Sequence, residues 1–395
     1  MKLNQGRMLT SMPGPSVIPD RVLGAMHTAM PNIYKGALVE TSVSIFDELP
    51  AIARTAGRAF MAISNGHGAW EMSLTNTLSR GDTVLVLESG RFAVGWGDQA
   101  RVLGAEVEVL YAPERGPIDP GAVEERLRAD TGHKIKAILA VQVDTASGVW
   151  NDIAAIGRAI KAAGHPALYM VDSVASIACV EYLMDEWGVD VTVGGSQKGL
   201  MVPPGLGMVW ANDKALAVHQ NADMRTPYWD WSARLSDDAH YMRYCGTAPI
   251  QHIYAMRAAL DMIAEEGLEA IWSRHAVFAS AVRAAVEAWH VDGGLEFNIV
   301  DPAHRSNSTT TVLSGSIDAE RLCAICEHDA GLVLGIGLGD FAGRSFRIGH
   351  MGHLNPPMVL GTLATIEAAL HAMKAPIGAS GAAAAAQVVA DALNS

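Results

Sequence analysis

Hydrophobic and polar positions in the first half of the chain alternate between two periods. Short apolar runs rich in β-branched residues, typical of buried strands, are separated by stretches with apolar positions at helical spacing. Strands are expected at 60–64, 83–88, 106–111, 135–143, 167–172, 189–193 and 207–211, and helices at 19–30, 42–59, 69–78, 92–103, 119–130 and 153–163. This alternation predicts βαβ units and an α/β fold with a largely parallel sheet that helices cover on both faces.

The pattern becomes irregular after residue 212 and then turns regular again. Aromatic and polar residues mix at 224–232 and 241–249, which are expected to be loops. Helices are then expected at 251–266, 268–289, from 318 and at 358–373, strands at 297–300, 309–313 and 346–351, and a weakly helical, peripheral Ala/Gly-rich tail at 378–386. We therefore expect an N-terminal segment over 1–18, a large domain over 19–265 and a smaller C-terminal α/β domain over 266–395.

Composition narrows the classes of partner. The 395-residue chain carries a formal net charge of −13 and has no run of basic residues, so we expect neither nucleic acid nor a membrane surface as a partner. Its four cysteines are too few for a disulfide framework, and no apolar stretch has the length of a signal core or a membrane span. These features predict a cytoplasmic protein that acts on small molecules.

Lys198 stands in the most informative stretch of the chain. The apolar run 189–193 is followed by two glycines, a Ser-Gln-Lys triplet and then a Pro-Pro-Gly turn that ends at Gly205. The nearest charged residues in the sequence are Asp190 and Asp213, so small and apolar residues surround the lysine. Such surroundings lower the pKa of an amine and favour a Schiff-base nucleophile. Taken alone, however, an ordinary loop lysine that reaches solvent is the simpler interpretation.

Asp172 strengthens the case for chemistry at Lys198. The run 167–172 is apolar until this last residue, and a carboxylate at the end of a buried strand is costly unless a cation or a strong donor meets it. A pyridinium nitrogen is both, and pyridoxal phosphate enzymes use an acidic residue to keep that nitrogen protonated. A surface aspartate at a strand end is the alternative, and the pairing with a lysine at the next strand end weakens it.

The turn Asn65, Gly66, His67 and Gly68 joins an expected strand to an expected helix. Backbone N–H groups and the helix dipole at such a turn can hold a phosphate. The signal is weak by itself, because a plain glycine turn has the same sequence.

These residues together resemble a known family. The stretch Val171-Asp172-Ser-Val-Ala-Ser176, followed by Gly195-Ser-Gln-Lys198-Gly-Leu-Met-Val-Pro-Pro-Gly205, resembles the class V aminotransferases of pyridoxal phosphate fold type I. More narrowly, the chain is similar to the alanine–, serine– and aspartate–glyoxylate aminotransferases, from Pro13 to Gly352. The resemblance implies pyridoxal 5′-phosphate as cofactor, a seven-stranded type of sheet in the large domain, and a homodimer with shared active sites.

The resemblance also implies roles for single residues. Lys198 matches the Schiff-base lysine, and Asp172 matches the partner of the pyridine nitrogen. The remaining cofactor residues that it implies are Asn65, Gly66 and His67 in the phosphate loop, Phe92 over the ring, Thr145 near the phenolic oxygen, Gln197 beside the lysine, and Tyr244 and Thr247 at the phosphate of the neighbouring subunit. No residue is expected to bind a metal.

For the substrate, Arg347 matches an arginine that binds the α-carboxylate in a fork, and Gly14 matches a substrate contact. The implied reaction is a ping-pong transfer of an amino group from a small amino acid to glyoxylate, with serine, alanine and aspartate unresolved as donors. Aspartate needs a second cation. Arg344 and His350 are each three positions from Arg347 and would face away from it on a strand, which leaves Lys35 or a residue of the partner chain.

Three alternatives stay open on the sequence. A fold type I lyase, such as a cysteine desulfurase or a kynureninase, would need a reactive thiol, for which Cys245 is the candidate. A pyridoxamine–pyruvate type transaminase is the second alternative, and a cofactor-binding regulator is the third. Cys323 and Cys326 spell C-x-x-C inside an amphipathic helix, and we interpret them as core residues.

Overall fold

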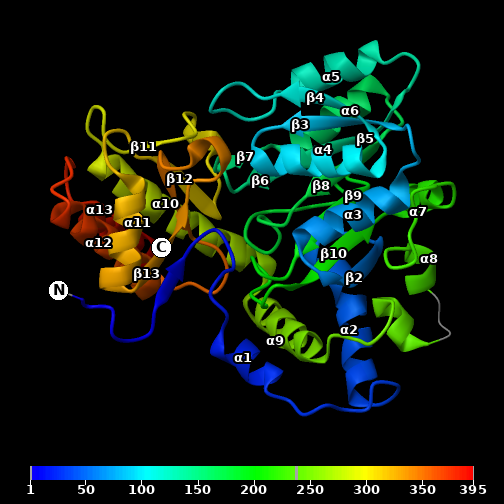
Figure 1. Ribbon diagram of the computed structural model, residues 1–395, viewed down its shortest axis with the longest axis horizontal. Helices are drawn as coiled ribbons and strands as arrows, with labels where there is room; N and C mark the ends of the chain where they lie inside the picture. Colours follow the sequence, from blue (N-terminus) through cyan, green and yellow to red (C-terminus); the bar gives the residue numbers. More distant parts are fainter. Residues whose placement is uncertain (1, 236–238, 395) are drawn as a thin grey trace.

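The chain forms two β-sheets, each with its own helices, as a ribbon view of the computed structural model shows (Figure 1). The structure describes residues 2–235 and 239–394. In that part of the chain, none of the helices has both the length and the apolar character needed to cross a bilayer.

The larger sheet has seven strands. Their spatial order is β2 (Arg58–Ser64), β10 (Gly205–Ala211), β9 (Val191–Gly195), β8 (Leu168–Asp172), β5 (Ile135–Val141), β3 (Thr83–Glu88) and β4 (Glu106–Tyr111). Only β10 runs against its neighbours. The predicted α/β class with a mostly parallel sheet is therefore confirmed. A short hairpin, β6 (Val143–Asp144) and β7 (Val149–Trp150), follows β5.

Helices cover both faces of this sheet, which explains its nearly continuous apolar strands. In β3, for example, Leu85 and Leu87 pack on one face, while Val84 and Val86 pack on the other. The first face carries α1 (Asp20–Met26), α2 (Ala37–Ile52), α5 (Pro120–Ala129), α6 (Ile153–Ala163), the 3-10 turn η1 (His240–Tyr244) and α9 (Ile250–Glu266), and the second carries α3 (Gly66–Thr77), α4 (Arg91–Leu103), α7 (Asp213–His219) and α8 (Trp231–Arg234).

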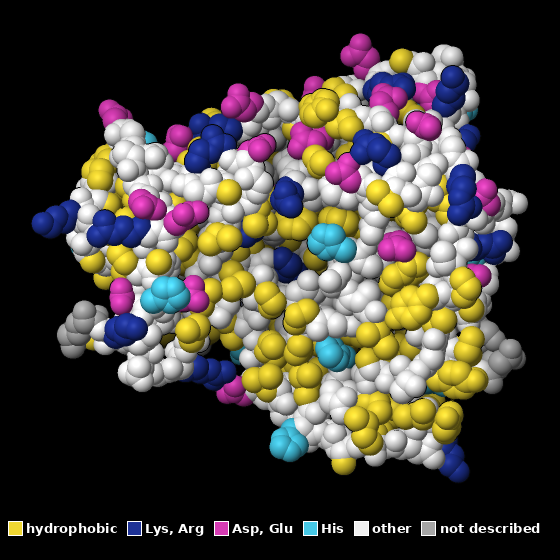
Figure 2. Space-filling view, viewed as in Figure 1, with side chains coloured by type: hydrophobic (Ala, Val, Ile, Leu, Met, Phe, Trp, Pro, Cys, Tyr) yellow, Lys and Arg dark blue, Asp and Glu magenta, His cyan; other side chains and the backbone are white. Residues whose placement is uncertain are grey.

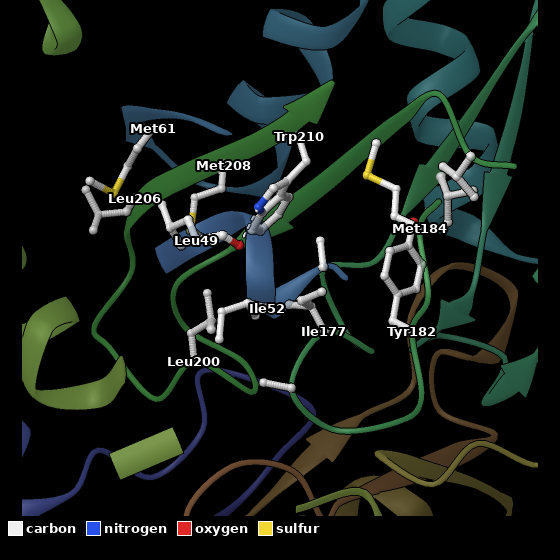
Figure 3. Close-up of a cluster of buried hydrophobic side chains, with 14 of the residues drawn as sticks. Leu49, Ile52, Met61, Ile177, Tyr182, Met184, Leu200, Leu206, Met208 and Trp210 are labelled. Atoms are coloured by element: carbon white, nitrogen blue, oxygen red, sulfur yellow. Dashed lines mark hydrogen bonds between the residues drawn. The ribbon is translucent and has the colours of Figure 1, made fainter. Parts of the chain in front are cut away.

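The buried cluster on the first face also anchors the loops that follow β8 and β9 (Figure 3). Trp210 of β10 donates a hydrogen bond from its indole to the carbonyl of Leu49 in α2, at 2.8 Å. Ile177 and Leu200, in the two loops, are completely buried in the same cluster. Truncating such a buried side chain costs about 2–5 kcal/mol. The core therefore holds both loops in place, including the loop that carries Lys198.

The smaller sheet has five strands in the order β1 (Leu9–Ser11), β13 (Leu332–Ile336), β14 (Ser345–Gly349), β12 (Thr309–Leu313) and β11 (Glu296–Phe297). It packs with α10 (Leu268–Trp289), α11 (Ala319–Ala330), α12 (Pro356–Ala372) and α13 (Gly381–Leu393), while two 3-10 turns, η2 (Pro302–His304) and η3 (Gly339–Phe341), lie in its loops. Strand β1 pairs in parallel with β13, so the N-terminal segment joins the C-terminal sheet.

Several sequence-based expectations differ from the structure. The tail is not peripheral, because α13 packs tightly on α10: a Cβ on Gly381 would lie 2.5 Å from the Trp289 ring, and Ala385 and Val389 are buried. Strands β1 and β13 were not predicted. The second helix begins at Ala37, earlier than expected, and ends at Ile52, because the φ of +53° at Arg54 stops the α-helix before residue 59.

Candidate active site

A small cavity of about 100 Å³ lies at the carboxyl ends of β8 and β9, next to the start of α3. The carboxyl edge of a parallel sheet is where α/β proteins bind their ligands. Its lining consists of Gly66, His67, Trp70, Phe92, Val143, Thr145, Asp172, Val174, Ala175, Gln197 and Lys198. Every predicted cofactor residue except Asn65, Tyr244 and Thr247 is on this lining.

Asp172 is the last residue of β8 and is 4% exposed. One carboxylate oxygen accepts a hydrogen bond from the Trp70 indole at 2.8 Å, and the other accepts from the backbone N–H of Val174 at 2.7 Å. Burial nevertheless raises the pKa of Asp172 to about 6, because the two donors offset only part of the lost hydration. A cation in the cavity would stabilise the ionised carboxylate.

Lys198 extends under the N-terminal segment, where its ammonium donates a hydrogen bond to the carbonyl of Pro13. A Cβ on Gly14 would lie 2.5 Å from the Lys198 nitrogen, so a side chain there would displace the end of the lysine, and the φ of +104° itself favours glycine. Burial and the nearby positive charge of Arg347 lower the pKa of Lys198 to about 8, although Asp172 acts in the opposite direction. A substantial neutral fraction at neutral pH makes this amine a nucleophile and a base.

The first turn of α3 points its backbone at the cavity. The side-chain oxygen of Asn65 caps this helix by accepting from the N–H groups of His67 and Gly68, at 3.0 and 3.4 Å. Asn65 therefore shapes the turn and does not line the cavity, whereas Gly66 and His67 do. Burial, followed by the positive charge of Arg91, lowers the pKa of the His67 imidazole. A neutral imidazole can stack on a ring or donate one hydrogen bond.

A buried carboxylate, Asp144, holds the segments that carry Phe92 and Thr145 next to each other. The sequence did not indicate this role. Asp144, which is completely buried, accepts hydrogen bonds from the backbone N–H of Phe92 at 2.8 Å and of Ala146 at 2.9 Å. Burial raises the pKa of Asp144 in spite of these donors. Asp144 thus fixes the start of α4 and the hairpin after β5 in one arrangement, with Phe92 and Thr145 on the cavity.

Arg347 lies in β14, just outside the cavity lining, and connects the two sheets. Its Nε donates to the carbonyl of Ile336 at 2.7 Å, and its Nη1 donates to the carbonyl of Thr145 at 2.9 Å. Burial lowers the pKa of Arg347 to about 10, so it stays charged at neutral pH. A guanidinium has five N–H donors, and three of them remain for a carboxylate.

Three predicted residues lie away from the cavity of their own chain, and two of them, Tyr244 and Thr247, were predicted to reach the phosphate of the neighbouring subunit. Lys35 is exposed on the loop before α2, and this position in the chain does not support it as the second carboxylate anchor. Tyr244 is 1% exposed and its hydroxyl meets the hydroxyl of Ser42, so it faces the core of its own chain. Thr247 is exposed before α9.

Cysteine chemistry is not supported at the cavity. Cys245, the candidate nucleophile of a desulfurase, donates a hydrogen bond to the carbonyl of Pro227 at 3.2 Å and is not on the lining. Cys323 and Cys326 lie in the core of the smaller sheet, where burial raises their pKa values to about 11 and about 12. Across residues 2–235 and 239–394, no group of three or more His, Cys, Asp or Glu side chains could hold a metal ion.

Sequence reasoning also missed Trp70, which donates to Asp172 and packs face to face on Trp96 with ring centroids 6.1 Å apart. A signal was present, because Trp70 follows Gly66 by one helical turn and therefore points in the same direction. Nothing in the sequence near Asp144 indicated that it holds the start of α4, because that partner, the backbone N–H of Phe92, lies some fifty residues earlier.

The donor set of the cavity fits pyridoxal phosphate. Asp172 matches a protonated ring nitrogen, Lys198 matches an aldehyde, and the start of α3 supplies N–H groups for a phosphate. The side-chain oxygen of Gln197 is buried and has no hydrogen-bond partner within the described residues, as expected of a group that meets a ligand.

Comparisons with known proteins agree with this chemistry. A family model described as aminotransferase class-V matches residues 59–338. A serine–glyoxylate aminotransferase of Methylorubrum extorquens is 39% identical over 373 residues, which cover 92% of this chain and 91% of that protein. An L-aspartate–glyoxylate aminotransferase of Paracoccus denitrificans is 37% identical over 385 residues, which cover 95% and 94%.

A solved structure agrees as well. The ureidoglycine–glyoxylate aminotransferase of Bacillus subtilis superposes with a TM-score of 0.89 at 28% identity, with 98% of this chain and 100% of that chain covered. The arrangement of lysine, aspartate and arginine is thus found in a chain whose sequence and fold both match one family. The chain belongs to the class V aminotransferases and is a pyridoxal-phosphate-dependent transaminase.

Proposed function

We propose that this enzyme transfers an amino group from a small amino acid to glyoxylate. The observation that carries the proposal is the grouping of Asp172 and Lys198 on one cavity, with the guanidinium of Arg347 close enough to Lys198 to lower the pKa of its amine. The relatives named as serine–glyoxylate and L-aspartate–glyoxylate aminotransferases support glyoxylate as the acceptor.

Pyridoxal phosphate, when bound, supplies an aldehyde and a pyridine ring that takes up electrons from the substrate. Asp172 holds the ring nitrogen in its protonated form, and this cation in turn stabilises the buried carboxylate. Arg347 binds the α-carboxylate of the donor through the N–H groups that Ile336 and Thr145 do not use.

Lys198 moves the proton in this mechanism. With a pKa of about 8, its amine is basic enough to accept a proton from Cα of the donor, and its neutral form is sufficiently populated near neutral pH. The same amine returns a proton to the bound acceptor in the second half of the cycle. Phe92 and His67 line the cavity, and their rings would pack against the cofactor when it is bound.

The proposed activity is tested by the formation of glycine from glyoxylate. Cofactor-loaded protein is incubated with serine, alanine or aspartate, and we expect glycine from at least one donor. Lys198→Ala should reduce turnover by ~10⁴-fold or more, because it removes both the nucleophile and the base. Arg347→Lys should raise KM for the amino acid, since lysine cannot form the fork.

Two other reactions serve as controls. Sulfide release from cysteine without any 2-oxo acid would favour a lyase, and amino transfer from pyridoxamine to pyruvate would favour a pyridoxamine–pyruvate type transaminase. If loaded protein made no glycine with any donor, the proposal would be wrong.

We also propose a homodimer in which the partner completes the site. Ile63 and Tyr228 are 44% and 38% exposed, and the Tyr228 hydroxyl donates to the carbonyl of Ile63 at 3.2 Å. Both lie beside the turn that begins α3. Hydrophobic side chains gather on the lower part of the face in Figure 2, where Figure 1 draws α2, α9 and β2. Light scattering at micromolar concentration should give twice the chain mass, and a fully active monomer would contradict the proposal.

We infer a cytoplasmic enzyme, because Cys179, Cys245, Cys323 and Cys326 are all unpaired. Free thiols are the usual state in a reducing compartment. Fractionation of cells with a compartment marker tests this inference, and activity outside the cytoplasm would overturn it.

A further inference from the structure

A second and larger hollow adjoins the cofactor cavity. This cleft, of about 670 Å³, lies between the carboxyl end of the seven-stranded sheet and the smaller sheet, and Gly90, Arg91, Ser147, Gly339 and Arg344 are among the residues that line it. Figure 2 shows Lys and Arg side chains along the hollow near the centre of the face. Serine and glyoxylate need far less room than the cleft provides. The cleft can therefore accommodate a larger or more highly charged substrate.

Three arginines line the cleft, and the side chains of two of them already bind other groups of the chain. Arg115 donates to two backbone carbonyls and forms an ion pair with Glu296 at 3.2 Å. Arg344 donates to the carbonyl of Asp340 at 2.9 Å. Arg91 is exposed, and within the described residues it has neither a hydrogen bond nor an ion pair from its side chain. It is thus the lining guanidinium available to an anionic ligand.

Arg91 stands directly at the active site. It is the first residue of α4, and the next residue, Phe92, lines the cofactor cavity. Its side chain extends to the smaller sheet, where a Cβ on Gly339 would lie 3.4 Å from the Arg91 Nη1. Its positive charge is also close enough to His67 to lower the pKa of that imidazole.

Arg91 and Arg347 both contact the segment that runs from β13 to Gly339. Arg347 donates to the carbonyl of Ile336, and Arg91 reaches Gly339, three residues further along. Three residues of chain span at most about 10 Å, so both guanidinium groups lie against the same short segment. Each has N–H donors left for a carboxylate, so a short ligand with two carboxylates can meet both arginines.

We propose that Arg91 determines donor specificity by binding the side-chain carboxylate of a dicarboxylic amino acid of the aspartate class, while Arg347 holds its α-carboxylate. This proposal rests on the proposed aminotransferase function and specifies its donor. Arg91 is then the second carboxylate anchor, for which the sequence suggested Lys35 or a residue of the partner chain. Serine and alanine have no second carboxylate, so their reaction does not depend on Arg91.

The test is a single-turnover measurement on the cofactor-loaded enzyme, which follows the loss of the visible cofactor band with aspartate and with serine. We expect Arg91→Gln to lower kcat/KM for aspartate at least tenfold, about 1.4 kcal/mol, and to change the value for serine less than twofold. Arg91→Lys keeps the charge and loses the fork, so an intermediate value is expected. Arg344→Gln, a change in the same cleft, is the matched control and should leave the aspartate-to-serine ratio unchanged.

Other outcomes would overturn the proposal in distinguishable ways. Equal losses for aspartate and serine would mean that Arg91 only supports the start of α4. A wild-type enzyme that reacts with serine and not with aspartate would refute the role of Arg91 and leave the aminotransferase function intact. Inactivity with every donor would refute the proposed function, and this proposal with it.

Discussion

Replacing Asp172 by asparagine should change how the stability of the cofactor-free protein depends on pH. The side chain keeps its size, so the packing at the end of β8 is preserved, and only the titrating group is lost. Burial raises the pKa of Asp172 from 3.8 to about 6 in the folded protein. The folded state therefore binds this proton more tightly than the unfolded state does.

The size of the effect follows from the shift. About two pKa units correspond to roughly 3 kcal/mol. Because the folded-state pKa is raised, this contribution to the free energy of unfolding is fully present below pH ~4 and is lost as the pH rises through ~6. The asparagine variant lacks this loss. Its free energy of unfolding, minus that of the wild type, should increase by roughly 3 kcal/mol between pH 4 and pH 7.

The asparagine amide also turns its NH2 group toward one of the two donors that meet Asp172 in the wild type, the Trp70 indole or the Val174 backbone N–H. This clash lowers the stability of the variant by a similar amount at every pH, about 1–3 kcal/mol, and so does not change the trend. Urea unfolding at fixed protein concentration, followed by circular dichroism at four pH values, measures the difference. A difference that stayed constant or fell between pH 4 and pH 7 would refute the reasoning.

Three further predictions concern the same cavity. Trp70→Phe removes a donor to Asp172, whose pKa then rises further, and a fluorescence titration should show an approximately tenfold weaker Kd for pyridoxal phosphate; an unchanged Kd would contradict this. Lys198 has a pKa of about 8 and reacts as the neutral amine, so its rate of reaction with the cofactor aldehyde in stopped-flow absorbance should rise with pH up to ~8 and level off above ~9; a pH-independent rate would contradict this. Gly14→Ala places a Cβ 2.5 Å from the Lys198 nitrogen, so kcat should fall at least tenfold, about 1.4 kcal/mol, and an unchanged kcat would exclude the crowding.

The sequence predicted those parts of the fold whose signal is local. Strands β3 and β4 and helices α6 and α10 begin and end at the predicted residues, because their hydrophobic period is interrupted by Gly, Pro or Asp at both ends. Lys198 and Asp172 were predicted for the same reason, since each breaks an apolar run at its carboxyl end.

Features that depend on distant contacts could not be predicted in this way. The Ala-rich helix α13 has few large side chains, and only its close packing against Trp289 makes it part of the core. Arg91 looks like an ordinary exposed residue at a helix start until the smaller sheet brings Gly339 to its tip. Lys35 had the right charge, but no hydrophobic period indicates the path of its loop.

The two sheets meet at Lys198, and this junction has a consequence for catalysis. The N-terminal segment leaves the smaller sheet at β1 and crosses the loop of the larger one, where the Ser16 hydroxyl donates to the Lys198 carbonyl at 2.7 Å. Arg347 crosses in the other direction to Thr145. In the free enzyme the positive charge of Arg347 lowers the pKa of Lys198. Burial lowers this pKa further, but a donor carboxylate that binds Arg347 neutralises its charge and so acts to raise the pKa of Lys198. The lysine therefore becomes a stronger base when a donor is bound and a proton has to leave Cα.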